Sequence, residues 1–150
     1  MKNKLVAFLI FAGIFLAASL SLPTDCLHAA EDVSVHITAV VASQESEYVD
    51  PELKAIADEI KTLFTYSSYK KLKRYTVVLD EGSSDRVILP QDNPLVVTYK
   101  GMDPDGKISI QLDMNDLLNA DFSVMNGGHI LIGGPEYNNG NLILLIEATQ

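Results

Sequence analysis

Histidine is the side chain of this sequence best suited to acid–base chemistry or metal binding, and two histidines, His36 and His129, lie beyond the N-terminal segment. His36 falls on the polar side of an alternating stretch, and His129 directly follows two glycines. A metal site would need both together with a carboxylate, since catalytic zinc usually has three protein ligands. A Ser–His–Asp arrangement is also open because its members meet only in space, although no Gly-x-Ser-x-Gly motif is present. Surface or turn positions are favoured, and the sequence predicts no catalytic residue and no metal ligand.

Two glycine-containing segments resemble ligand-binding loops. Asp103-x-Asp105-Gly106 is similar to the middle of a calcium-binding helix–loop–helix segment, but Gly101 and Leu112 would then occupy its first and twelfth ligand positions. A hairpin turn is therefore predicted there. The glycine pairs at 127–128 and 133–134 bracket a short apolar segment and do not open a helix, as a phosphate loop would. They are predicted to be turn glycines with positive φ, and no cofactor is expected.

One basic cluster, Lys70 to Arg74, holds four of the nine cations that follow the N-terminal segment. It could dock an acidic partner or anionic lipid. Alternatively, its charges could keep an exposed strand edge from pairing with neighbours. The candidate partner-binding residues are Tyr69, Lys70, Lys71, Lys73 and Arg74. Tyr66 and Tyr69 could stack on a sugar, but core packing is the favoured interpretation of both.

The N-terminal segment has the order of a secretory signal peptide: Lys2 and Lys4, then an apolar run from Leu5 to Leu22, then Pro23. The sequence predicts a signal peptide over residues 1–29, cleaved near residue 29 or 30, and a single domain over residues 30–150. An uncleaved membrane anchor and a lipid-modified Cys26 are alternatives. The chain is therefore expected to be exported, to the periplasm or the exterior.

Composition excludes several classes of protein. Cys26 is the only cysteine, so the processed domain would contain neither a disulfide nor a thiolate metal site and would not be a cysteine enzyme. Without Lys2, Lys4 and Asp25, the chain retains 9 basic and 19 acidic residues, a net charge of −10. Such a domain repels nucleic acid and anionic lipid as a whole, so membrane contact is expected only through an uncleaved signal segment.

The elements that must position these residues are mostly strands. Residues 33–41 alternate with period two, which predicts a first strand, and residues 43–49 are predicted to be a loop. Asp50-Pro51-Glu52 begins an amphipathic helix of about four turns whose apolar residues are Leu53, Ile56, Ala57, Ile60, Leu63 and Phe64. Seven strands are then predicted, near residues 72–79, 86–89, 95–99, 107–114, 120–125, 129–132 and 142–148.

The predicted fold is mainly β (α+β), in the order β-α-β(6–7). An antiparallel β-sandwich or strongly curved sheet carries the one N-terminal helix. Residues 142–146 are apolar at every position, so both faces of the last strand should be covered.

Three segments together resemble small exported bacterial β-rich proteins of unassigned function. They are the Phe-x-Tyr-Ser-Ser-Tyr element at residues 64–69, Leu89-Pro90, and the Ile-Gly-Gly-Pro hairpin at residues 132–135 with the following Gly140-x-Leu142-Ile143-Leu144. The resemblance covers most of residues 33–149 and implies a fold. It implies no catalytic or binding residue.

The function that the sequence favours is a non-enzymatic binding or assembly module of the cell envelope, which contacts another envelope or secreted protein. Its contact would be an exposed sheet edge or the basic cluster. Two alternatives stay open: a small secreted hydrolase using His36 or His129, and a structural subunit of a surface layer or fibre.

Overall fold

The computed structural model describes residues 31–150, so the predicted signal peptide, its cleavage site and Cys26 lie outside the described residues. The described chain is mainly β, with one short helical segment, as predicted. Its strands form two sheets, of five and four strands. None of the helices in this part of the chain is long and apolar enough to cross a membrane.

The five-stranded sheet has the order β2-β3-β1-β9-β8, and its pairs are antiparallel except for the two-residue parallel pairing of β2 with β3. Its strands are β1 (Val33–Ser43), β2 (Tyr48–Val49), β3 (Ser68–Leu79), β8 (Gly128–Tyr137) and β9 (Gly140–Thr149). The region predicted as a loop before the helix thus contains the short strand β2, whose two residues are too few to show a period.

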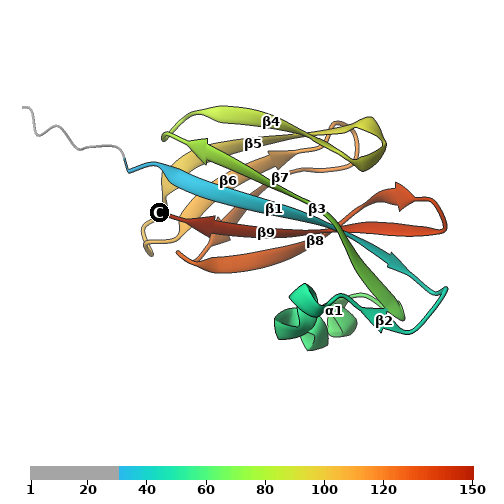
Figure 1. Ribbon diagram of the computed structural model, residues 1–150. Helices are drawn as coiled ribbons and strands as arrows, with labels where there is room; N and C mark the ends of the chain where they lie inside the picture. The colour runs from blue at the N-terminus through green and yellow to red at the C-terminus, as the bar shows by residue number, and fades with distance from the viewer. Residues whose placement is uncertain (1–30) are drawn as a thin grey trace, which may run out of the picture.

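The four-stranded sheet is an antiparallel meander that covers one face of the five-stranded sheet (Figure 1). Its strands are β4 (Ser84–Leu89), β5 (Asn93–Met102), β6 (Ile108–Asp113) and β7 (Asn119–Val124), and the short 3-10 segment η2 (Pro90–Asp92) joins β4 to β5. Alternate apolar residues of both sheets form one core between them, including Val35, Ile37, Ile110 and Ile146. Burial of this apolar surface is the main stabilising contribution to the fold.

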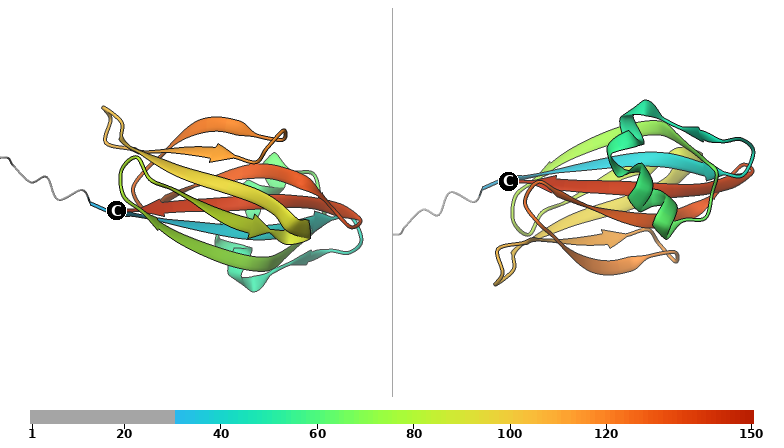
Figure 2. Two further views of the ribbon diagram at one scale, coloured as in Figure 1. Left: turned by 90° about the horizontal axis from the view of Figure 1, so that it is seen from above. Right: turned by 90° about the horizontal axis from the view of Figure 1, so that it is seen from below.

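The helical segment packs on the opposite face of the five-stranded sheet (Figure 2, right). Asp50 caps it as predicted, since Asp50 Oδ1 accepts a hydrogen bond from the Glu52 amide at 3.1 Å. The predicted four-turn α-helix is wrong in detail: residues Pro51–Ile56 form a 3-10 helix, η1, and only Ala57–Leu63 form an α-helix, α1. Because a 3-10 helix has 3.0 residues per turn, the apolar stripe changes phase, and Leu63, predicted on the stripe, is 57% exposed.

The C-terminal hairpin is present as β8 and β9, but the prediction that its glycine pairs are turn residues with positive φ is wrong for three of the four. Gly133 and Gly134 lie inside β8, which continues through a bulge to Tyr137, and neither has a positive φ. Gly134 is instead closely packed, because a Cβ there would lie 3.2 Å from the Leu142 Cβ. Only Gly127 of the four adopts the predicted positive φ, at 74°.

Each face of the five-stranded sheet is covered over only half of its length. The inner face, which meets the four-stranded sheet, is covered toward the chain termini, where Ser34 pairs with Thr149. The outer face is covered by η1 and α1 at the opposite end, over Val40, Ala42, Tyr69 and Ile143 (Figures 1 and 2). Two half-faces therefore stay uncovered, at opposite ends of the same sheet. Strand β9, apolar from residue 142 to 146, passes under both covers and is buried there, as predicted.

Candidate functional site

The predicted basic cluster does not form a single patch, because it lies on strand β3, where successive side chains point to opposite faces, and a bulge decides which of its residues share a face. In the pairing of β3 with β1, Ala39 lies opposite Lys73 and Val40 lies opposite Lys71, which leaves Leu72 as the extra residue. Side chains on β3 alternate between faces on either side of this bulge. The cluster is therefore distributed over both faces of the sheet.

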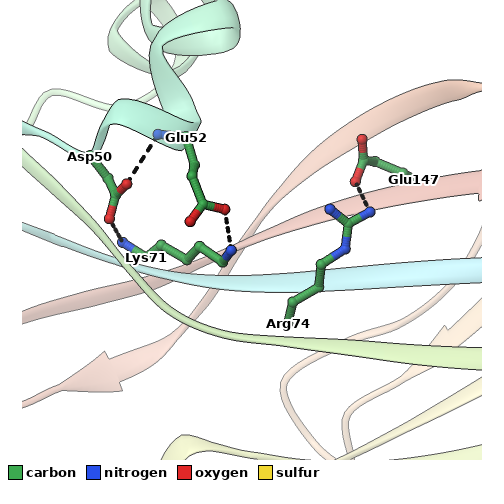
Figure 3. Close-up of polar contacts among 5 residues, drawn as sticks. All are labelled: Asp50, Glu52, Lys71, Arg74 and Glu147. Atoms are coloured by element: carbon green, nitrogen blue, oxygen red, sulfur yellow. Dashed lines mark hydrogen bonds and ion pairs between the residues drawn. The ribbon is translucent and has the colours of Figure 1, made fainter.

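Two of the cations, Lys71 and Arg74, lie on the outer face and are already paired (Figure 3). Lys71 Nζ contacts Glu52 of η1, and the Lys71 amide donates to Asp50 Oδ2 at 3.4 Å. Arg74 Nη2 donates to Glu147 Oε2 at 3.0 Å. These pairs join η1 to β3 and β3 to β9, and they leave little free charge for a partner.

The predicted contact residue Tyr69 is 1% exposed, so it is not available at the surface. Its hydroxyl donates to the Phe64 carbonyl at 2.5 Å and accepts from the Tyr66 amide at 3.2 Å. These bonds hold the chain where it leaves α1 and enters β3. Core packing, the favoured interpretation of Tyr69, is confirmed.

Lys70 and Lys73 differ from Lys71 and Arg74, because neither makes an ion pair within residues 31–150. Both are exposed, and the Lys73 ammonium lies 4.9 Å from the centre of the Tyr75 ring. Beyond the two residues that pair with β2, β3 is an edge strand of its sheet. Lysine on such an edge opposes pairing with other chains, which supports the edge-protection interpretation of the cluster.

A groove of about 980 Å³ lies where the inner face of the five-stranded sheet extends beyond the four-stranded sheet. The ends of β1 and β3, the turn between β1 and β2, and the tip of the β8–β9 hairpin form it. Its lining residues are Val41, Ser43, Glu45, Ser46, Tyr48, Ser68, Lys70, Leu72, Tyr137, Asn138, Asn139 and Gly140. A smaller hollow of about 380 Å³ adjoins it and shares Tyr48.

The groove is polar but carries little charge. Eight of its twelve lining residues are Tyr, Ser, Asn or Gly, and Lys70 is its only cation. Its only carboxylate, on Glu45, accepts a hydrogen bond from the Asn139 side chain at 2.8 Å. Lys70 is therefore the one charged group of the groove that has no charged or hydrogen-bonding side-chain partner among residues 31–150.

A row of ionisable residues crosses the uncovered half of the outer face. Glu147 of β9 lies directly opposite His36 of β1 on one side and opposite His129 of β8 on the other. The two histidines are thus two strand spacings apart, about 10 Å between Cα atoms, on the same face of the sheet. The sequence could not place the two histidines together, because this requires the pairing of β1 with β9, two strands that are over 90 residues apart in the chain.

Each member of this row has a second polar neighbour. His36 Nδ1 lies 2.8 Å from Thr76 Oγ1, and His129 Nε2 lies 2.8 Å from Glu59 Oε2 of α1. Glu147 is the carboxylate that pairs with Arg74. We call the half-face that carries His36, Glu147 and His129 the histidine face. No three His, Cys, Asp or Glu side chains among residues 31–150 are arranged around a common point that could hold a metal.

The Asp103 loop is a hairpin turn between β5 and β6, as predicted. Asp103 Oδ1 accepts hydrogen bonds from the amides of Asp105 and Lys107, each at 2.9 Å. The bond from the Lys107 amide is the main reason that the pKa of Asp103 lies below its ordinary value. The carboxylate thus serves the turn itself.

Comparisons of this chain with protein-family models, with curated proteins and with solved structures found no match. The resemblance to small exported β-rich proteins therefore stays a prediction. The groove and the histidine face are described from this chain alone.

Proposed function

We propose that this chain is an exported, non-enzymatic binding module that holds a segment of another envelope or secreted protein in the groove. The observation that carries the proposal is the composition of the groove, which is dominated by Tyr, Ser, Asn and Gly. These residue types also dominate antibody combining sites, where tyrosine gives rigid amphipathic contact area and the small polar residues give adaptable hydrogen bonds.

The position of the groove supports a role in binding. It lies at the end of the domain opposite residues 31 and 150, the two ends of the described chain (Figure 1). An attachment through the N-terminal segment would therefore leave the groove facing away from the point of attachment. The proposal thus fits both a cleaved domain and an anchored one.

The charge of the groove indicates which kind of partner segment it can bind. Lys70 is the groove cation, and it makes no ion pair within residues 31–150, so a segment bound in the groove should place a carboxylate near its ammonium. A pairing at the rim of a contact contributes mostly to the rate and specificity of association. Contact through the whole basic cluster is not proposed, because Tyr69 is buried and Lys71 and Arg74 are paired.

The test is affinity capture from the producing cell's envelope with Lys70→Glu and a matched control. Lys54→Glu makes the same charge change at an exposed position of η1, outside the groove. We expect Lys70→Glu to weaken capture of a specific partner at least tenfold, about 1.4 kcal/mol, and Lys54→Glu to leave it unchanged. Equal capture by both variants would remove the groove from the proposal.

A small hydrolase is the second candidate, favoured by the row in which His36 and His129 flank Glu147. A histidine beside a carboxylate is a common general base. Assays against ester, peptide and phosphoester substrates test it, with His36→Gln and His129→Gln as variants. Turnover that either variant abolishes would replace the non-enzymatic proposal.

A further inference from the structure

We propose that the free edge of β8 pairs antiparallel with the same edge of a second copy of this chain and so forms a two-fold symmetric dimer. The inference is independent of the groove and of the partner proposed for it. β8 is the outermost strand on its side of the five-stranded sheet, so the N–H and C=O groups on that side have no strand partner among residues 31–150 (Figure 1). Another strand can satisfy these groups in a regular hydrogen-bond ladder.

β8 differs from the other edge strands in its lack of charge. Natural proteins commonly protect sheet edges with charged side chains, lysine above all. Apart from the two-residue β2, every other edge strand of the described chain carries charged residues: Lys70, Lys71, Lys73 and Arg74 on β3, Asp85 and Arg86 on β4, and Asp121 on β7. β8 has no Asp, Glu, Lys or Arg before Glu136. Its edge therefore lacks this protection.

The unprotected part of β8 is short and regular. It pairs with β9 without interruption from Gly128 to Gly133, and the bulge and Pro135 come after that segment. A proline has no N–H to donate and a bulge twists the strand, so pairing with a second copy should end there. The segment from residue 128 to residue 133 is nevertheless as long as an ordinary strand.

The sequence of this segment is complementary to itself. Two identical antiparallel strands in a two-fold dimer are symmetric about one position. With Leu131 at the centre, Ile130 of each copy lies opposite Ile132 of the other, and the two Leu131 side chains lie opposite each other. Such apolar cross-strand pairs stabilise a sheet. His129 would face Gly133, so no like charges oppose each other across the pair.

Charge is the reason that a second copy is the proposed occupant. An uncharged apolar edge is matched best by another uncharged apolar edge, because a charged side chain placed opposite it would lose water without gaining a partner. Among residues 31–150, the regular part of β8 is the strand edge with this property. Because the pairing uses the same edge on both copies, it closes at the dimer and does not continue into a fibre.

The helix places a further apolar side chain at the same edge. Glu59 of α1 contacts His129 of β8, and Leu63, one turn later, lies on the same side of the helix. This side of α1 therefore points toward the β8 edge, where Leu63 is 57% exposed in the monomer. In the proposed dimer both copies of α1 lie on the same face of one continuous sheet, so the second copy would shield Leu63 from water.

The proposed interface is small, which predicts weak association. One pair of short strands and Leu63 place it below about 1,200 Å² of total buried surface, the range of weak and transient complexes. We therefore expect a dissociation constant in the micromolar range. The excess of acidic over basic residues makes the two copies repel each other, so added salt should tighten the dimer.

The test is disulfide cross-linking of the full chain in the producing cell, in a Cys26→Ser background that removes the only native thiol. Directly opposite residues of an antiparallel pair have Cβ atoms about 4.5–5.5 Å apart, so Leu131→Cys should form a dimer linked through position 131 under mild oxidation. Gly133→Cys is the register control, because the two copies of residue 133 would lie roughly 13 Å apart along the strands. Val78→Cys is the exposure control, since Val78 is 59% exposed on β3.

We expect Leu131→Cys to form its dimer at least tenfold faster than either control. A second measurement covers the case in which this variant does not fold. Light scattering of the unaltered chain, as isolated from the producing cell, should show dimers and no larger species as its concentration rises from about 1 to 100 µM, and Leu63→Lys should shift this transition to higher concentration. Equal cross-linking by all three cysteine variants, an unaltered chain that stays monomeric throughout, or growth beyond the dimer would overturn the proposal.

Discussion

The groove and the histidine face are the two uncovered halves of one sheet, and they differ in almost every property that decides what a surface binds. The groove is concave and carries little charge, and Lys70 makes no ion pair within residues 31–150. On the histidine face, Glu147 is paired with Arg74, His129 with Glu59 of α1 and His36 with Thr76. A concave surface with uncommitted polar groups suits a polypeptide segment, whereas the polar groups of the histidine face already have partners within the domain.

The comparison also shows how one strand can serve two purposes. Along β1, inward residues change from Ile37 and Ala39, under the second sheet, to Val41 and Ser43, in the groove. Outward residues change in the opposite direction, from the uncovered polar His36 on the histidine face to the covered apolar Val40 under the helix. On β1, the polar residues His36 and Ser43 thus lie where no other element covers the sheet.

The largest expected effect on stability comes from loosening α1 from the outer face that it covers. Ile60→Ala removes a fully buried side chain that holds α1 on the outer face, and we expect it to lower the free energy of unfolding by about 2–5 kcal/mol. Leu63→Ala, in the same helix but exposed, should change it by less than about 0.5 kcal/mol. Urea denaturation of both variants makes the measurement, and equal effects would contradict the packing described for the helix.

Gly140→Ala tests the floor of the groove. A Cβ at Gly140 would lie 2.1 Å from the carbonyl oxygen of Ala42, so β1 and β9 would have to separate there. We expect a loss of about 1–3 kcal/mol in stability and a loss of partner capture. Gly133→Ala is the control, because its nearest contact would be an ordinary 3.6 Å from the Phe64 ring.

Tyr69→Phe sharpens the distinction between buried and available tyrosines. It leaves the Phe64 carbonyl and the Tyr66 amide without their partner, at a cost of about 1–3 kcal/mol. Tyr48→Phe, in the groove and 45% exposed, should leave the unfolding midpoint in place. Thermal denaturation compares the two variants; a stable Tyr69→Phe would make its hydroxyl dispensable.

The contact between the histidine face and α1 should contribute less to the free energy of unfolding than the Tyr69 hydroxyl does. His129 and Glu59 are both partly exposed, so we expect Glu59→Gln to lower the free energy of unfolding by under about 1 kcal/mol. At a pH at which His129 is protonated, added salt should reduce the difference between variant and parent, because it screens exposed charges. A salt-independent loss, measured by denaturation in low and high salt, would indicate packing and not charge.

The smallest expected effect on stability is that of Asp103, which lies outside both uncovered half-faces. Its pKa in the folded protein is below the ordinary 3.8, so its stabilising contribution is present above that pH and is lost as the pH falls through the lowered folded pKa. Asp103→Asn should therefore weaken the dependence of stability on pH below about 3.8. Acid unfolding curves that coincide for variant and parent would contradict this contribution.

Much of the fold could be predicted because its signals are local. Strand alternation and the turn residues located β1 and β3 to β9 to within a few residues, and Asp50-Pro51 marked the start of the helical segment. The division of that segment into η1 and α1 could not be predicted, since both helix types tolerate the same apolar residues. The continuation of β8 through Gly133 and Gly134 was hidden for a similar reason, because glycine there serves packing and not a turn.

Less of the candidate sites could be predicted from the sequence. The basic cluster was visible as a run of charges, but strand alternation divides it between two faces, and the bulge at Leu72 decides which residues share a face. The histidines were visible one by one, and only the registers of β1 and β8 with β9 bring them to Glu147. One sequence pattern could have indicated the groove, namely the change from apolar to small polar residues at the ends of long strands.

The most direct test of the binding proposal is site-specific photo-cross-linking in the producing cell. A photoreactive residue replaces Tyr137 in the groove or, as the control, Ile88, which is 48% exposed on β4 of the other sheet. A discrete cross-linked partner should form from position 137 alone, and Lys70→Glu should abolish it. Cross-links from both positions alike, or from position 88 alone, would contradict the assignment of the groove as the contact site.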